Sequence, residues 1–192
     1  MVISVGVMYH AAFIPCFTAS LVAYAVSLVM GVEPTRFHVE IPATDVSLML
    51  RVGVLATLCA VVSIIFCKVI HVVERQMKKR IPNSWTRVIV GGFAVAILST
   101  VCGTTDYNGA GMNIITDAIY GKAKYEAFLL KILFTAITIS AGFKGGEIVP
   151  TFCVGATFGC VFGGMLGLDY GFAAALGLVG LFCCATNSPV SA

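Results

Sequence analysis

Long stretches without a single charged residue constrain this chain more than any other feature. Lys, Arg, Asp and Glu are absent from residues 1–32, 52–67, 88–105, 148–168 and 170–192. Charged residues make up only 11% of the chain, whereas a soluble domain carries about 25%. A soluble domain of 192 residues would need a polar surface that so few charges cannot supply. The sequence therefore predicts an all-α polytopic membrane protein, embedded in the lipid bilayer.

Composition and motifs exclude several other classes of protein. The eight cysteines lie in apolar runs of a long chain, so a secreted disulfide scaffold is excluded. A net charge of +3 without a basic stripe argues against a nucleic-acid partner. The cysteines form no C-x-x-C pair, and we expect them to pack as small apolar residues rather than to bind a metal. Since no nucleophile–base pair, Walker loop or dinucleotide fingerprint is present, we predict neither an enzyme nor a cofactor.

Six apolar segments approach the length of about 20 residues that a transmembrane helix needs. They are residues 7–31, 48–70, 87–103, 126–142, 148–167 and 171–185. The first, second and fifth are the best candidates, whereas the third and fourth are short. Residues 107–120 are too polar to span but have one apolar side, which suits a re-entrant or interfacial segment. Lys131 lies inside the fourth segment, and we expect its side chain to snorkel to the membrane interface.

The loops between these segments differ in charge. The stretch 68–87 carries six Lys or Arg residues and one acid, whereas the loop 32–45 carries three acids and one Arg. Loops rich in Lys and Arg stay on the cytoplasmic side of a membrane. The sequence therefore predicts a cytoplasmic basic stretch at 68–87 and an external loop at 32–45.

Glycines mark two places in the second half of the chain. Gly155, Gly159 and Gly163 repeat every four residues within 148–167, a spacing that lets a neighbouring helix approach closely. In the run 140–150, Gly145 and Gly146 permit unusual backbone geometry, and Pro150 suits the first turn of a helix. This run predicts that one helix ends and another begins at membrane depth. The free N–H groups of such a helix start can bind an anion.

Glu147 lies at this predicted helix start, and its position has two interpretations. The carboxylate could satisfy free N–H groups or the helix dipole, as acidic residues commonly do at helix N-termini. Alternatively it is an ionisable group within the membrane that carries a proton or gates an ion. Composition and spacing leave both interpretations open.

The run Gly-Gly-Glu-Ile-Val-Pro at 145–150, with the glycine-rich helix after it, resembles the Gly-Gly-x-Phe-x-Pro signature of the CLC chloride channels and transporters. The glycine-rich stretch 108–113 and segment 171–192 also resemble parts of this family, in the same order. The resemblance implies the tilted and interrupted helices of a CLC-type inverted-repeat transporter. It further implies that residues 1–192 are a partial transmembrane domain, the C-terminal half only and incomplete.

The family holds anions largely through backbone N–H groups at helix N-termini. By motif position the resemblance implies an anion-binding set and two structural signature residues: Gly146, Glu147, Ile148 and Val149 for the anion, and Gly145 and Pro150 for the signature. Ile148 replaces the Phe of the signature, which binding through the backbone tolerates. No residue matches the family's gating glutamate, its serine-containing loop or its late tyrosine. We therefore expect a fragment that does not transport ions alone.

A glutamate after the two glycines resembles the fluoride/proton antiporter branch of the family. The resemblance thus implies proton-coupled exchange of fluoride or chloride, in a bacterial plasma membrane. A passive chloride channel and a truncated, non-transporting membrane scaffold are the alternatives. Homodimers are typical of the family, and the first apolar segment supplies the candidate contacts Phe13, Phe17, Leu21, Tyr24 and Leu28.

Overall fold

The computed structural model describes residues 13–32, 37, 39–43, 45–143 and 145–186. In this part of the chain it contains seven α-helices and no β-strand. The chain divides into two compact units, Met1–His38 and Val39–Ala192. The prediction of an all-helical chain is confirmed for the described residues.

Helix α2, Phe13–Val29, makes up most of the described part of the first unit. Its large side chains are exposed, as expected of a helix that meets lipid or another chain rather than its own core. The chain leaves the helix through Gly31, whose φ of +76° suits glycine. The predicted span 7–31 was a strong candidate, but its apolar described portion, Ile14–Val29, is shorter than a typical membrane-crossing helix. The first six residues of that predicted span lie outside the described residues.

Helix α3, Val46–Arg80, begins where the Asp45 side chain accepts a hydrogen bond from the N–H of Val46. Its 35 residues give a length of about 52 Å at 1.5 Å per residue. The predicted membrane-spanning segment 48–70 lies within this helix, which continues beyond it to Arg80. The segment 71–80 remains helical because it consists largely of good helix formers, and Glu74 and Lys78 form an ion pair one turn apart.

Helix α4, Ser84–Cys102, corresponds to the predicted segment 87–103 but begins earlier. It begins three residues earlier because the Asn83 side chain accepts a hydrogen bond from the N–H of Trp85, at 3.0 Å. At 19 residues α4 is long and apolar enough to cross a membrane, as are α3 and α7. The remaining apolar helices of the described chain are shorter.

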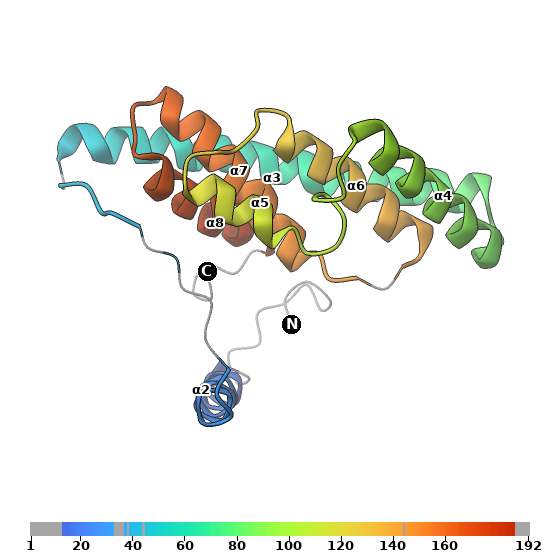
Figure 1. Cartoon of the computed structure of the whole chain (residues 1–192), viewed down its shortest axis with the longest axis horizontal. Coiled ribbons are helices and arrows are strands. Elements are labelled where there is room, and N and C mark those ends of the chain that lie inside the picture. The colour runs from blue at the N-terminus through green and yellow to red at the C-terminus, as the bar shows by residue number, and fades with distance from the viewer. Residues whose placement is uncertain (1–12, 33–36, 38, 44, 144, 187–192) are drawn as a thin grey trace. The chain divides into compact units, whose positions relative to one another are not determined.

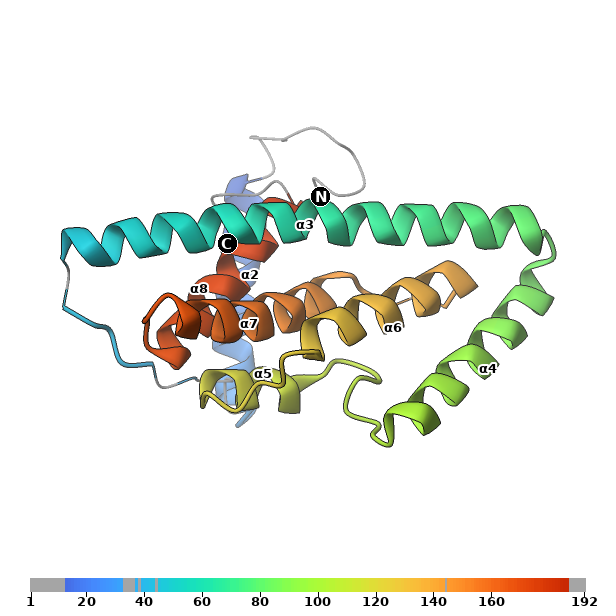
Figure 2. The same cartoon turned by 90° about the horizontal axis from the view of Figure 1, so that it is seen from above.

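The remaining helices of the second unit are α5 (Met112–Ile119), α6 (Ala127–Ala141), α7 (Ile148–Met165) and α8 (Tyr170–Thr186). Helix α7 packs against α5, α6 and α8. Helix α3 runs along α6, α7 and α8, and α4 returns at an angle from its far end (Figures 1 and 2). Helix α5 is short and packs its apolar side, including Ile115 and Ala118, against α7 and α8. The segment 107–120 therefore does not span, in agreement with its polar sequence.

The glycine repeat of α7 brings α8 into close contact. A Cβ atom at Gly155 would overlap the backbone of Gly177, and one at Gly159 would overlap that of Ala173. At Gly163 it would overlap the side chain of Ala173. The prediction that these glycines serve helix packing is confirmed, and ten residues of α7 are buried as a result.

Candidate functional site

The break between α6 and α7 lies where the sequence predicts it. Helix α6 ends at Ala141, and Gly142 follows in a left-handed conformation with a φ of +100°. Helix α7 begins at Ile148, so Pro150 is its third residue and lies in the first turn. A proline there costs no helical hydrogen bond, because the first N–H groups of a helix have no partner within it.

This helix start has a group of backbone donors that have no acceptor among the described residues. The first hydrogen bond of α7 runs from the N–H of Thr151 to the carbonyl of Glu147, at 3.1 Å. The N–H groups of Gly146, Glu147, Ile148 and Val149 make no hydrogen bond to any described residue. Together with the helix dipole, such donors favour an anion.

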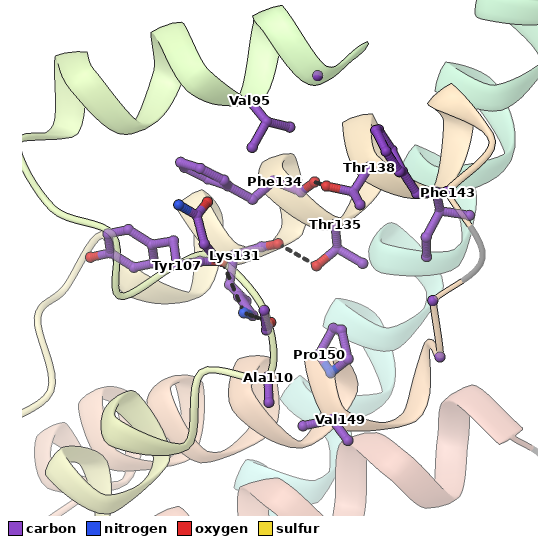
Figure 3. Close-up of a pocket in the computed structure, with 16 residues that line it drawn as sticks. Val95, Tyr107, Ala110, Lys131, Phe134, Thr135, Thr138, Phe143, Val149 and Pro150 are labelled. Atoms are coloured by element: carbon purple, nitrogen blue, oxygen red, sulfur yellow. Dashed lines mark hydrogen bonds between the residues drawn. The ribbon is translucent and has the colours of Figure 1, made fainter. Parts of the chain in front are cut away.

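A pocket of about 500 Å³ lies beside this helix start (Figure 3). Its walls come from α4, the loop 107–110, α6 and the segment that leads into α7. Phe134, Thr135 and Thr138 of α6 form one side, and Tyr107 and Ala110 lie on the loop side. Among the described lining residues no side chain is acidic, and Lys131 is the charged one. The composition of the walls therefore favours a small anion over a cation.

The structure brings four of the six predicted site residues to this pocket: Gly145, Gly146, Val149 and Pro150. Glu147 and Ile148 are not among its lining residues, and both side chains are exposed. The Glu147 carboxylate makes no capping hydrogen bond to a described residue; its backbone carbonyl instead accepts one from the Thr151 hydroxyl, at 2.6 Å. Of the two interpretations of Glu147, the capping role thus has no hydrogen bond to support it.

Lys131 does not snorkel to the interface, and that prediction is wrong. Its side chain is only 1% exposed. The ammonium donates hydrogen bonds to the carbonyl oxygens of Tyr107, at 3.0 Å, and Gly109, at 2.8 Å. The side chain extends from α6 to the loop near Ala110 at the edge of the pocket (Figure 3). The glycine-rich loop makes this possible, because its carbonyls solvate a charge that would otherwise have to leave the bilayer.

The loop itself is fixed from a second side. Asn108 and Ser99 of α4 exchange hydrogen bonds of 3.1 and 3.2 Å. Gly109 and Gly111 both have positive φ, +62° and +74°, and Gly111 precedes the first residue of α5. A lysine within an apolar segment, following a glycine-rich stretch, was the sequence signal for this arrangement, although it does not say which carbonyls the lysine meets.

Comparison with known proteins identifies the family of this chain. The family model described as voltage gated chloride channel matches residues 2–192. The chain belongs to this family. It is also similar to the crystal structure of a CLC-type fluoride/proton antiporter, with a TM-score of 0.85 and 31% identity over 95% of this chain and 47% of the other. The resemblance read from the signature and the CLC-type fold are thereby confirmed.

Two curated relatives extend the comparison of this CLC chain. A chloride/fluoride channel protein of Pseudomonas syringae pv. tomato is 28% identical, over 99% of this chain and 44% of the relative. A voltage-gated ClC-type chloride channel, ClcB, of Escherichia coli O17:K52:H18 is 25% identical, over 99% of this chain and 46% of the relative. The chain thus spans about half the length of the curated relatives it matches.

Proposed function

We propose that the whole protein is a CLC-type halide transporter that exchanges fluoride or chloride for protons and holds the anion at the N-terminus of α7. The observation that carries the proposal is the set of N–H groups from Gly146 to Val149, which have no acceptor among the described residues. They lie beside a pocket whose described lining residues include one cation, Lys131, and no acid. Hydrogen bonds from backbone N–H groups to an anion are charge-assisted, so they bind it more strongly than they bind a neutral ligand.

The names of two similar proteins support fluoride as the anion and coupling to protons. One is named a chloride/fluoride channel protein and the other a fluoride/proton antiporter. Glu147 adds an ionisable group two residues before Val149, on an exposed position at the helix start. A carboxylate there can take up and release a proton beside the anion site, which a passive pathway would not require.

Removal of one backbone donor tests the anion site. In the whole protein, Val149→Pro deletes an N–H at a helix position where proline is tolerated, whereas Val149→Ala keeps the N–H and serves as the control. A hydrogen bond to a charged group contributes about 1.5–3 kcal/mol, so halide flux into liposomes should fall at least about tenfold in Val149→Pro only. Equal flux in both variants would remove the α7 N-terminus from the anion path.

The same liposomes separate the alternatives. Halide and proton flux that rise and fall together support exchange. Halide flux without proton movement would instead favour a passive chloride channel, as the E. coli relative is named. Absence of both fluxes in the wild-type protein would favour a non-transporting membrane scaffold.

We further propose a homodimer in which α2 supplies part of the contact. Leu21, Tyr24 and Leu28 are 54%, 49% and 46% exposed, and Phe17 is also exposed; the side chain of Phe13 lies outside the described residues. Leu21→Trp with Leu28→Trp should weaken the dimer. Subunit counting in dilute lipid checks this, with Val26→Trp, at an exposed position on the opposite face of the same helix, as the matched control.

The basic end of α3 supports a cytoplasmic position for the stretch 68–87, in a bacterial plasma membrane. An impermeant thiol reagent should label Asn83→Cys from the cytoplasmic side and Glu40→Cys from outside, in a background without native cysteines. Labelling of both positions from one side would refute this orientation.

A further inference from the structure

The C-terminal end of α3 projects beyond the helices that it packs against. Its 35 residues are about 52 Å long, whereas the hydrocarbon core of a bilayer is about 30 Å thick. Residues 52–67 carry no charge, and charges begin at Lys68. Figure 2 shows this end of the helix extending past α6 before the chain turns back into α4. Because charged side chains are costly within the hydrocarbon core, we expect the segment 68–80 in the headgroup region of the membrane.

Much of the positive charge at this end is not neutralised within the described chain. Lys78 pairs with Glu74, the one ion pair among the described residues. Arg75, Lys79 and Arg80 are exposed and form no ion pair with a described residue. Clusters of Lys and Arg at the end of a transmembrane helix attract anionic lipid headgroups. The charge of this end therefore complements an anionic partner at the membrane surface.

A groove of about 380 Å³ lies on the same end of α3, and we call it the α3 groove. Its described lining residues are Val72, Val73, Gln76, Met77, Arg80 and Ile81. They form two rows along the helix, since residues four apart lie on one face. Most of these side chains are apolar, and the cation among them, Arg80, lies at the end away from the charge-free part of the helix. The α3 groove thus combines an apolar wall with a positive charge at its outer end.

Trp85 is a further interfacial feature of the same end. It lies in the first turn of α4, after the short turn that follows Arg80, and its side chain is 81% exposed. Tryptophan is enriched at membrane–water interfaces, because its ring is apolar while its N–H can reach headgroups and water. An exposed tryptophan beside exposed cations therefore fits a surface that meets lipid headgroups.

We propose that the α3 groove binds one anionic phospholipid. Arg80 binds the phosphate, to which a planar guanidinium can donate two hydrogen bonds, and an acyl chain lies along Val73 and Met77. A soluble phosphate would contact only the charged end of the groove, and a zwitterionic lipid brings a cation of its own next to the unpaired cations. The α3 groove shares no described lining residue with the pocket at the start of α7, so this inference does not depend on halide transport.

Native mass spectrometry of the purified whole protein tests the proposal with three probes. They are phosphatidylglycerol, phosphatidylcholine with the same acyl chains, and glycerol 3-phosphate, which has no acyl chain. The wild type should bind phosphatidylglycerol about fivefold more tightly than phosphatidylcholine, the size expected for one unpaired cation near an anionic headgroup. Arg80→Gln should lose most of that preference. Lys79→Gln removes the same charge from the neighbouring residue, which is not among the described lining residues, and should stay within about twofold of the wild-type affinity.

Several results would overturn the lipid site. Equal losses in Arg80→Gln and Lys79→Gln would mean diffuse attraction to the basic end rather than a site. Glycerol 3-phosphate that binds as tightly as phosphatidylglycerol would mean a site for free phosphate. A wild type without preference for phosphatidylglycerol would also overturn it, as expected if another part of the whole protein fills the groove. If Arg80→Gln does not yield monodisperse protein, Gln76→Glu places an acid in the groove instead, and unchanged phosphatidylglycerol affinity in that variant would refute the proposal.

Discussion

Glycine has opposite roles at the start of α7 and in the middle of the same helix. In the middle, Gly155 and Gly159 let α8 approach until backbone meets backbone. Just before the helix, a Cβ on Gly145 or Gly146 would meet nothing within 4 Å, and the N–H groups from Gly146 to Val149 make no hydrogen bond to a described residue. The middle of the helix is therefore fixed by packing, whereas the backbone at its start is open for a ligand. Substitutions should affect stability in the first case and transport in the second.

The largest effect, a loss of stability, is expected from Gly159→Leu in the packed middle of α7. Because the overlap is with the backbone of Ala173, α8 would have to move, at a cost of about 3 kcal/mol or more. We expect little monodisperse protein after detergent extraction, measured by size-exclusion chromatography. Gly53→Leu, on an exposed part of α3 with nothing within 4 Å, is the matched control and should give a normal yield.

Glu147→Gln should change transport but hardly change stability. The carboxylate makes no capping bond to a described residue, so the free energy of unfolding should change by no more than about 0.5 kcal/mol, as for an ordinary surface substitution. If Glu147 serves the ion path, the fluoride-over-chloride preference or the proton coupling should change. Paired halide and proton flux at two pH values checks this. Unchanged selectivity and stoichiometry would leave only the backbone site of Gly146 to Val149.

A second carboxylate, Glu74 in the charged end of α3, provides the contrast of a paired acid. Its hydrogen bond with Lys78 lowers the pKa of the Glu74 carboxyl. The pair therefore stabilises the protein above the carboxyl's unfolded pKa, and this contribution is lost as the pH falls through the lowered folded pKa. Glu74→Gln should cost about 0.3–0.5 kcal/mol near neutral pH and nothing in strong acid. Thermal unfolding at both pH values measures the difference, and a cost that persists in acid would contradict the pairing.

The smallest effect is expected from Gly146→Ala, at the open end of α7. The substitution keeps the N–H and adds a methyl group into free space. Stability and half-saturating halide concentration should both stay close to wild type, within about 0.5 kcal/mol. A large loss of halide affinity would mean that the anion lies against the Cα of Gly146, closer than a site built from N–H groups alone requires.

Much of the helical framework was predictable from local sequence. Gaps between charges located five of the six apolar segments, and apolar content located the sixth, 126–142, which contains Lys131. The glycines and proline of 142–150 located the break between α6 and α7. Helix ends were less predictable: the apolar segment 48–70 does not show that helix propensity and the Glu74–Lys78 pair continue α3 to Arg80.

The sequence by itself determined that this chain is a helical membrane protein in which one helix ends and another begins within 140–150, because apolar length, glycine and proline act locally. Only the tertiary structure determined that the Lys131 ammonium is buried rather than at the membrane interface. Its carbonyl partners lie 24 and 22 residues earlier in the chain, on a loop that Asn108 ties to Ser99 of another helix. Local sequence shows a lysine that could leave the bilayer, whereas the packing of α4, α5 and α6 around that loop provides the acceptors that keep its charge inside.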